Sequence, residues 1–395
     1  MAGPVCQRID GENREHCWLE SIRHSKFGFC ILILYPKEAE IPDLHPVRAV
    51  ITLSVVLPIT LAALLGAARF AGKDTKRPWL RLRSLLAAEF LGFLILCAAG
   101  YGYERHARAR AANLYPMPGR MVDVGGYRLH LNCVGEEGPT VVLDYGLEGS
   151  YFDWYRVQPE IAKFARVCLY DRAGYGWSDA SSMARVPSVT AEELHTLLHA
   201  AGETPPYIVV GHSYGALIAE MFAHKFPQDT AGAVLVDGFV LRSAPWFPLR
   251  YKLWLRFQQW TEPFGLPRWR GWCAEGPAQF RGEAEAAYCR SRVYAAYYRE
   301  HAQLALGGAE VRAIASLGST PLIVISRDPL LHHKPGEESG HMKDQEEMAK
   351  LSSNGRLVIA KGSGHDVPGM RPDVIIDAVK GLVRPPEQAG SPGTP

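Results

Sequence analysis

Residues 207–223 read Tyr-Ile-Val-Val-Gly-His-Ser-Tyr-Gly-Ala-Leu-Ile-Ala-Glu-Met-Phe-Ala, and this stretch decides the fold. An apolar run precedes the pentapeptide Gly-His-Ser-Tyr-Gly, and a helical pattern follows it, so the stretch predicts a strand, a sharp turn and a helix. A serine on such a turn presents its hydroxyl at the sheet edge. Glycines at 211 and 215 leave space for the neighbouring backbone. Ser213 is therefore the candidate nucleophile.

A serine hydroxyl attacks well only when a base removes its proton and a carboxylate orients that base. His365 follows an apolar run and precedes a terminal helical pattern, so it is the candidate base. The order serine, acid, histidine fits an acid between the two. Asp328 and Asp237 each close a strand-like run. We expect Asp328 to be the acid, with Asp237 as the alternative and Asp366 as the third choice.

The oxyanion that forms during acyl transfer needs two backbone N–H donors. Tyr214, directly after the nucleophile, is expected to supply one. The loop Asp144–Ser150 follows another predicted strand, and within it Leu147 comes directly after Gly146. Leu147 is expected to supply the second donor. No metal or other cofactor is expected, because acyl transfer to a serine needs none, and the loop histidines 332, 333 and 341 are interpreted as solvated.

The remainder of the chain after residue 120 alternates short apolar runs with helical patterns, which is typical of an α/β fold. Continuous apolar runs suit strands that are covered on both faces, so the sheet is expected to be mostly parallel. Eight candidate strands are Met121–Val124, Tyr127–Cys133, Thr140–Tyr145, Arg166–Asp171, Tyr207–Val210, Ala233–Val236, Leu322–Ser326 and Arg356–Ala360.

The segment from about 240 to 308 has no strand pattern and holds five of the nine tryptophans, interleaved with arginines. We interpret it as a helical lid inserted into a domain that spans 120–384. A Pro-, Gly- and Ser-rich tail at 385–395 is expected to be disordered. Contact between the lid and a bilayer surface is one hypothesis, and packing over an acyl pocket is the other.

These residues resemble the α/β-hydrolase family over roughly Met121–Val383, in the branch that includes esterases and lipases. The run Asp171–Ser178, Asp-Arg-Ala-Gly-Tyr-Gly-Trp-Ser, matches the loop that follows the fourth strand in that family. The resemblance implies an eight-stranded, mostly parallel sheet with a lid after strand six. Two departures stand out: Tyr145-Gly146 replaces the usual His-Gly, and Ser326-Arg327 replaces the usual glycine before the acid.

The front of the chain has a different composition. Residues 49–68 carry no charge, and twenty helical residues span a bilayer core of about 30 Å. Residues 85–103 are interrupted only by Glu89 and end in Tyr101 and Tyr103, which are typical of an interface. Two transmembrane helices are therefore expected within an anchor at 47–110, and the protein is predicted to be multi-pass. Segment 1–46 gives no clear signal.

Basic residues near the predicted spans indicate the orientation. The short connection between the spans holds Arg69, Lys73, Lys76, Arg77, Arg81 and Arg83. Lys and Arg favour the cytoplasmic side, so the hydrolase domain is expected on the non-cytoplasmic side. An oxidising compartment would permit a disulfide between Cys273 and Cys289, which flank one stretch of the lid. Cys97, Cys133 and Cys168 are interpreted as small core or lipid-facing residues.

The overall composition sets the remaining limits. The chain has 395 residues, of which 47% are hydrophobic and 21% charged, which excludes a disordered or fibrous protein. A formal charge of +2 indicates no strongly positive electrostatic potential that would attract nucleic acid, so nucleic acid is not expected as a partner. The leading hypothesis is a membrane-tethered serine hydrolase of carboxylic esters, including lipid-like ones. An acyltransferase with the same triad, and a non-catalytic membrane binding protein, are the alternatives.

Overall fold

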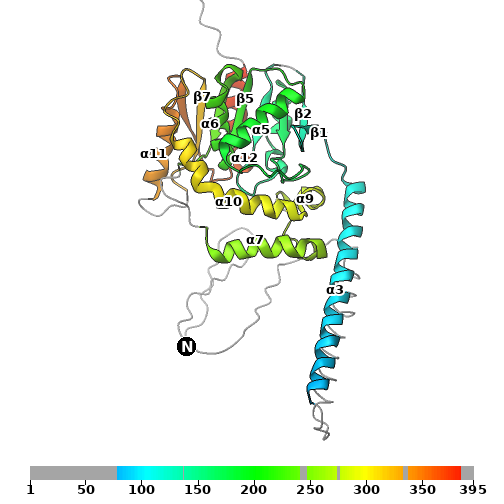
Figure 1. Cartoon of the computed structure of the whole chain (residues 1–395). Helices are drawn as coiled ribbons and strands as arrows, with labels where there is room; N and C mark the ends of the chain where they lie inside the picture. Colours follow the sequence, from blue (N-terminus) through cyan, green and yellow to red (C-terminus); the bar gives the residue numbers. More distant parts are fainter. Residues whose placement is uncertain (1–77, 137, 241–246, 274–275, 332–336, 384–395) are drawn as a thin grey trace, which may run out of the picture. The chain divides into compact units, whose positions relative to one another are not determined.

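A central sheet with helices on both faces forms the body of the molecule (Figure 1). The computed structural model describes residues 78–136, 138–240, 247–273, 276–331 and 337–383. The segment 1–46, the expected membrane span at 49–68 and the tail at 385–395 lie outside these ranges.

The sheet has eight strands in the order β1-β2-β4-β3-β5-β6-β7-β8. Their pairing is parallel from β4 to β8, whereas β1–β2 and β2–β4 are antiparallel. The expectation of a mostly parallel, eight-stranded sheet is confirmed. The strands are β1 Arg120–Asp123, β2 Arg128–Val134, β3 Val141–Asp144, β4 Val167–Tyr170, β5 Tyr207–His212, β6 Thr230–Val236, β7 Leu322–Arg327 and β8 Gly355–Ala360.

The two faces of the sheet are buried in separate apolar layers because successive side chains of a strand point to opposite faces. In β3, Val141 and Leu143 enter one layer and Val142 enters the other. This double burial explains the continuous apolar runs. The helices and short helical turns of the main domain outside the lid are η2 Tyr151–Trp154, α4 Gln158–Ile161, α5 Pro187–Ala200, α6 Tyr214–Lys225, η3 Pro227–Asp229, α11 Glu337–Ala349, α12 Val367–Met370 and α13 Pro372–Val383.

The lid lies between β6 and β7, and each element that the structure describes in it is a helix or a short helical turn. Its elements are α7 Leu249–Thr261, η4 Glu262–Phe264, α8 Leu266–Arg270, η5 Ala278–Phe280, α9 Arg281–Tyr288 and α10 Ser291–Arg312. A disulfide joins Cys273 to Cys289 and closes the connection from α8 to the end of α9, which confirms the predicted pair.

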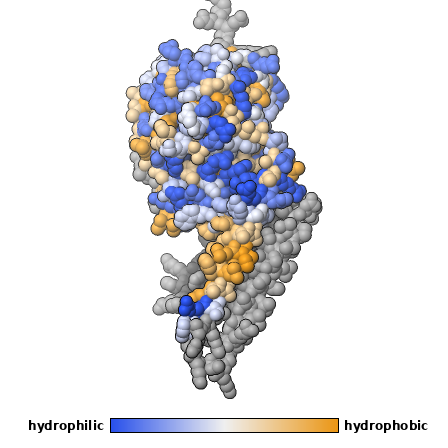
Figure 2. Space-filling model, turned by 45° about the vertical axis from the view of Figure 1, so that its right-hand side comes forward, coloured by the Kyte–Doolittle hydropathy of each residue, from blue (hydrophilic) through white to orange (hydrophobic). Residues whose placement is uncertain are grey.

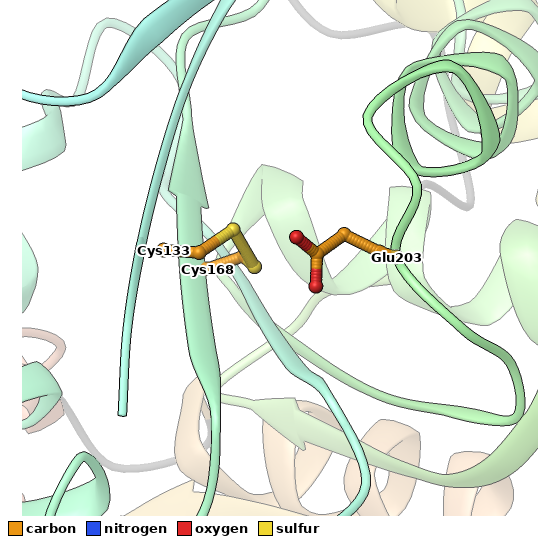
Figure 3. A group of neighbouring side chains, drawn as sticks. All are labelled: Cys133, Cys168 and Glu203. Carbon is orange, nitrogen blue, oxygen red and sulfur yellow. A yellow bond between two sulfur atoms is a disulfide. The ribbon is translucent and has the colours of Figure 1, made fainter. Parts of the chain in front are cut away.

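A second disulfide joins Cys133 to Cys168, which face each other across β2 and β4. The interpretation of these two cysteines as small core residues agrees with their place in one apolar layer, but the disulfide between them was not predicted, and it follows from the antiparallel pairing that places them opposite each other. Figure 3 shows the Glu203 carboxylate beside this disulfide. Arg166 binds that carboxylate at 2.6 and 2.8 Å, so the group is a disulfide next to an ion pair.

Helix α3, Pro78–Leu114, contains the second predicted span. Its apolar side chains are exposed; Phe90, for example, is 62% exposed and Ile95 58%. Figure 2 shows this apolar surface below the body. Within the described residues, α3 is the one helix whose length and composition would suffice to cross a membrane.

The end of α3 that follows its apolar part packs tightly on the lid. A Cβ at Gly100 would lie 2.5 Å from the carbonyl oxygen of Phe264, so the two backbones are in close contact. Glu104 is buried and binds Arg268 of α8 through two hydrogen bonds of 2.9 and 3.0 Å. Arg108 binds Glu262 at 2.6 Å. These contacts join α3 to η4 and α8.

Arg172, two residues after β4, is a fully buried cation. Its guanidinium donates to Asp144 at the end of β3 at 2.6 Å, and to both carboxylate oxygens of Glu300 in α10 at 3.0 and 3.2 Å. It also donates to the main-chain oxygens of Tyr145, at 2.8 Å, and Gly146, at 2.9 Å. One side chain therefore joins the sheet, the loop after β3 and the lid.

Replacing Glu300 with Ala is expected to destabilise the fold, because the buried Arg172 loses two charge-assisted hydrogen bonds. The free energy of unfolding should fall by about 3 kcal/mol or more, measured by urea denaturation. The matched control is Glu310→Ala on the same helix, which removes a 3.3 Å contact to the Ser188 N–H. This control should cost about 1 kcal/mol or less. Equal losses in both variants would contradict the role of Glu300.

Glu220 in α6 is 3% exposed, and burial raises its pKa to about 8. In the unfolded chain a glutamate has a pKa of about 4.3. The folded state therefore holds the proton more tightly, and stability falls as pH rises between these two values.

Glu220→Gln removes this titration. From about pH 5 to about pH 8, the free energy of unfolding of the wild type should fall by about 3 kcal/mol relative to that of the variant. Urea denaturation of both proteins at the two pH values measures the difference. A difference that stays constant with pH would contradict the raised pKa.

Candidate active site

Ser213 lies on the sharp turn between β5 and α6, as the sequence predicts. Its backbone is in the positive-φ region, with φ 55° and ψ −114°, which few non-glycine residues adopt. The turn needs both glycines: a Cβ at Gly211 would lie 2.0 Å from the Gly215 oxygen, and one at Gly215 would lie 2.5 Å from the Asp144 oxygen. The Ser213 hydroxyl therefore stands at the carboxyl edge of the sheet.

His365, in the loop after β8, reaches back to the nucleophile. Its Nε2 lies 3.0 Å from the Ser213 hydroxyl, and its Nδ1 lies 2.5 Å from a carboxylate oxygen of Asp237. With Nδ1 as donor, Nε2 is free to accept the serine proton. The structure thus brings together Ser213, His365 and the alternative acid Asp237 in the order that nucleophilic catalysis requires.

Asp328, the first choice of acid, does not contact His365. Its carboxylate accepts hydrogen bonds from the N–H groups of Leu330, at 2.9 Å, and Gly362, at 2.7 Å, and so ties β7 to the loop after β8. The third choice, Asp366, caps α12 through the Gly369 N–H at 3.0 Å. Neither carboxylate is placed to orient the base.

Strand order explains this correction. β6 lies between β5, which carries Ser213, and the more distant β7 and β8. The loop after β8 carries His365 across β7 to the end of β6, where its Nδ1 meets Asp237, the first residue after that strand, and its Nε2 meets Ser213. Asp328 follows β7 and lies one strand further from the nucleophile.

Three groups besides His365 hold the Asp237 carboxylate. His341 of α11 lies at 2.9 Å, the Arg327 N–H donates at 3.0 Å and the Arg327 guanidinium lies at 3.2 Å. Burial alone would raise the pKa of Asp237, but the hydrogen bonds from His341, His365 and Arg327 outweigh burial and hold that pKa well below its usual range. Asp237 therefore remains a carboxylate.

Sequence reasoning missed His341 and Arg327. His341 was interpreted as a solvated loop residue, whereas it lies in α11 and contacts Asp237. No local pattern marks it, because its contact joins positions 104 residues apart in the chain. Arg327 directly follows the apolar run of β7, and that position at the sheet edge was its only signal.

The expected oxyanion donors flank the nucleophile. A Cβ at Gly146 would lie 3.2 Å from the Ser213 Cβ, so the loop after β3 passes directly beside the serine. Neither Leu147 nor Tyr214 donates its N–H to a backbone oxygen of the described chain. Arg172 binds the Gly146 carbonyl, and the N–H of the same peptide, which belongs to Leu147, points the opposite way.

His212 lies beside the base without duplicating it. Its Nε2 is 2.8 Å from the main-chain oxygen of His365. Burial lowers the pKa of His212 to about 4, and the neighbouring charge of His365 also lowers it. His212 therefore stays uncharged near neutral pH and holds the loop that carries the base.

His195, His199 and Asp229 form another cluster of titratable side chains, with the two Nε2 atoms 3.1 Å apart. Asp229 immediately precedes β6, whereas Asp237 immediately follows it. The cluster therefore lies at the opposite edge of the sheet from Ser213 and takes no part in this site.

Comparison with known sequences identifies the same region. Residues 145–378 match the Alpha/beta hydrolase family, and this segment exceeds half of the chain. The uncharacterized protein YqjL of Bacillus subtilis is 39% identical over 103 residues, which are 26% of this chain and 41% of that protein. YbdG of the same organism is 24% identical over 164 residues, 41% of this chain and 50% of that protein. The chain thus spans half or less of these curated relatives.

Solved structures show the same fold. The enol-lactonase from Burkholderia xenovorans LB400 has a TM-score of 0.52 and 20% identity, with 67% of this chain and 99% of that chain covered. Cfl2 from Burkholderia cenocepacia has a TM-score of 0.50 and 20% identity, with coverages of 67% and 95%. With residues 145–378 matched and the strand order, elbow and late histidine in place, the chain belongs to the alpha/beta hydrolase family.

Proposed function

We propose that this chain is a membrane-tethered serine hydrolase that cleaves carboxylic esters through an acyl-Ser213 intermediate. The continuous hydrogen-bonded line from Ser213 through His365 to Asp237 carries the proposal, because it is the arrangement that makes a serine hydroxyl nucleophilic. An aspartate at the elbow would instead suit epoxide or halide displacement, and Ser213 does not support that chemistry.

In the first half of the reaction, His365 Nε2 accepts the Ser213 proton as Oγ attacks the ester carbonyl carbon. The carbonyl oxygen becomes an oxyanion, and the N–H groups of Leu147 and Tyr214 stabilise it. Asp237 holds the imidazolium that forms. The C–O bond to the alcohol then breaks, and His365 donates its proton to the leaving alkoxide, which departs as the alcohol.

In the second half, water replaces the alcohol. His365 accepts a proton from water, the hydroxide oxygen attacks the acyl carbon, and the bond to Ser213 Oγ breaks as His365 returns the proton to it. A carboxylic acid is released and the enzyme is restored. The His365 side chain is 53% exposed, so water reaches the base without a rearrangement of the loop.

The features of α3 support the membrane part of the proposal. Apolar side chains exposed along a helix are costly in water and favourable in lipid. The disulfides Cys133–Cys168 and Cys273–Cys289 are compatible with an oxidising compartment, which agrees with the basic connection expected on the cytoplasmic side.

Ser213→Ala is expected to abolish labelling by a fluorophosphonate probe, because the probe bonds to the activated serine oxygen. Gel fluorescence of the detergent-solubilised full chain measures the labelling. Ser353→Ala is the matched control, since Ser353 is exposed and, within the described part of the chain, its hydroxyl bonds only the Gly318 oxygen; its labelling should equal that of wild type. An unlabelled wild type, or equal labelling of Ser213→Ala, would exclude a serine hydrolase.

Asp237→Asn and Asp328→Asn separate the two candidate acids. Asp237→Asn keeps the shape but no longer stabilises the imidazolium, so kcat for p-nitrophenyl acetate should fall by about a thousandfold or more. Asp328→Asn should lower kcat far less, because among the described residues its carboxylate accepts from the N–H groups of Leu330 and Gly362 and contacts neither His365 nor Ser213. A larger loss in Asp328→Asn, with both variants folded by circular dichroism, would reverse the assignment.

A further inference from the structure

The lid helix α7 exposes a continuous stripe of large apolar side chains. They recur every three or four residues, so they lie on one face of the helix. Their exposed fractions are 69% for Leu249, 59% for Leu253, 42% for Phe257, 69% for Trp260 and, just beyond the helix in η4, 42% for Phe264. We call this set the α7 stripe. A lid helix in water would be expected to turn such a stripe inward.

The α7 stripe ends where α3 packs on the lid. Phe264, its last member, has its main chain against Gly100 of α3. In α3 the apolar segment ends at this same level, since Tyr103 is followed by Glu104, which binds Arg268. The end of the apolar segment of α3 therefore coincides with one end of the stripe.

Cations flank the stripe on α7. Arg250 is exposed and Lys252 is partly exposed, both near the first residues of the helix. Amphipathic helices that lie in a bilayer surface combine an apolar face with Lys and Arg at headgroup level. Figure 1 shows α7 along the lower edge of the body, with one end beside α3, whose lower part continues beyond that edge.

A cavity of about 160 Å³ lies between α7 and α10. Its lining residues are Glu148, Tyr251, Trp254, Leu255, Gln258, Trp272, Tyr294 and Tyr297. Tyr251 and Trp254 also line a surface hollow beside Pro248 and Arg250, so the same two side chains border both spaces. The hollow and the cavity are therefore neighbours at the N-terminal half of α7, on either side of Tyr251 and Trp254.

One residue of the cavity lining, Glu148, belongs to the loop after β3. Glu148 directly follows Leu147, and its carboxylate accepts hydrogen bonds from Tyr251 of α7 and His301 of α10, each at 2.6 Å. These bonds hold both lid helices to the loop that passes Ser213. Glu148 therefore links the lining of the cavity to the loop beside Ser213.

We propose that the α7 stripe is immersed in the same lipid leaflet that α3 enters, and that an ester dissolved in that leaflet reaches Ser213 through the cavity between α7 and α10. This inference rests on the proposed function and adds its substrate class, an amphipathic ester with a long acyl chain. The partner surface is the bilayer itself.

The direct test of immersion uses quenching of tryptophan fluorescence by brominated phosphatidylcholine in vesicles that hold the full chain. Trp260 should be quenched, so Trp260→Phe should lower the quenchable fraction of the signal. Trp269→Phe, in α8 and off the stripe, is the matched control: it removes a tryptophan outside the stripe, so the quenchable fraction should not fall. Equal quenching of wild type and Trp260→Phe would overturn the proposal, and this readout does not depend on any catalytic activity.

The test of substrate entry compares two esters with the same chromophore. Leu253→Gln/Phe257→Gln/Trp260→Gln removes three members of the stripe, while Leu306→Gln changes an exposed leucine of α10. In phosphatidylcholine vesicles, hydrolysis of p-nitrophenyl palmitate should fall about tenfold or more in the triple variant and stay unchanged in Leu306→Gln. Hydrolysis of water-soluble p-nitrophenyl acetate should stay within about twofold in both.

These outcomes separate the two proposals. If wild type hydrolyses neither ester, the proposed function fails while the quenching result still decides the immersion. If the triple variant hydrolyses the palmitate ester at the wild-type rate, entry from the leaflet is overturned. If Trp260 is shielded from brominated lipid and cross-linking traps a dimer that the triple variant loses, the stripe is a contact between two copies and the proposal is overturned.

Discussion

The buried guanidinium of Arg172 is the constraint on which the rest of the site depends. A cation removed from water must have its donors satisfied, and here two carboxylates and two main-chain oxygens satisfy them. The carboxylates come from β3 and from α10, and the oxygens come from the loop beside Ser213. The sheet, the expected oxyanion donors and the lid therefore share one set of hydrogen bonds, so the position of one limits the position of the others.

Sequence patterns predict much of this fold because its physical causes are local. Double burial makes the strands continuously apolar, and the elbow at Ser213 needs glycine at 211 and 215 for reasons of space. Each pattern is contained within a few residues. The pattern that identifies His365 is also local, since this residue follows a late strand and precedes a terminal helix.

Identifying the acid and the residues that hold it requires information that no short stretch of sequence contains. Asp237 and Asp328 have the same sequence signature, an aspartate after an apolar run, and only the order of β5, β6 and β7 across the sheet separates them. His341 approaches from a helix that no catalytic pattern marks. The pairing of Cys133 with Cys168 likewise follows from the register of two strands that β3 separates in the chain.

The junction between α3 and the lid has a mechanical consequence. Backbone contact at Gly100 and the buried ion pair of Glu104 with Arg268 leave no flexible linker between the helix and η4. Such a helix is a rigid connection to the domain and not a flexible one. In a bilayer, the nucleophile would then keep a constant height above the surface, and its search for substrate would be two-dimensional, limited by lateral diffusion and not by excursions through water.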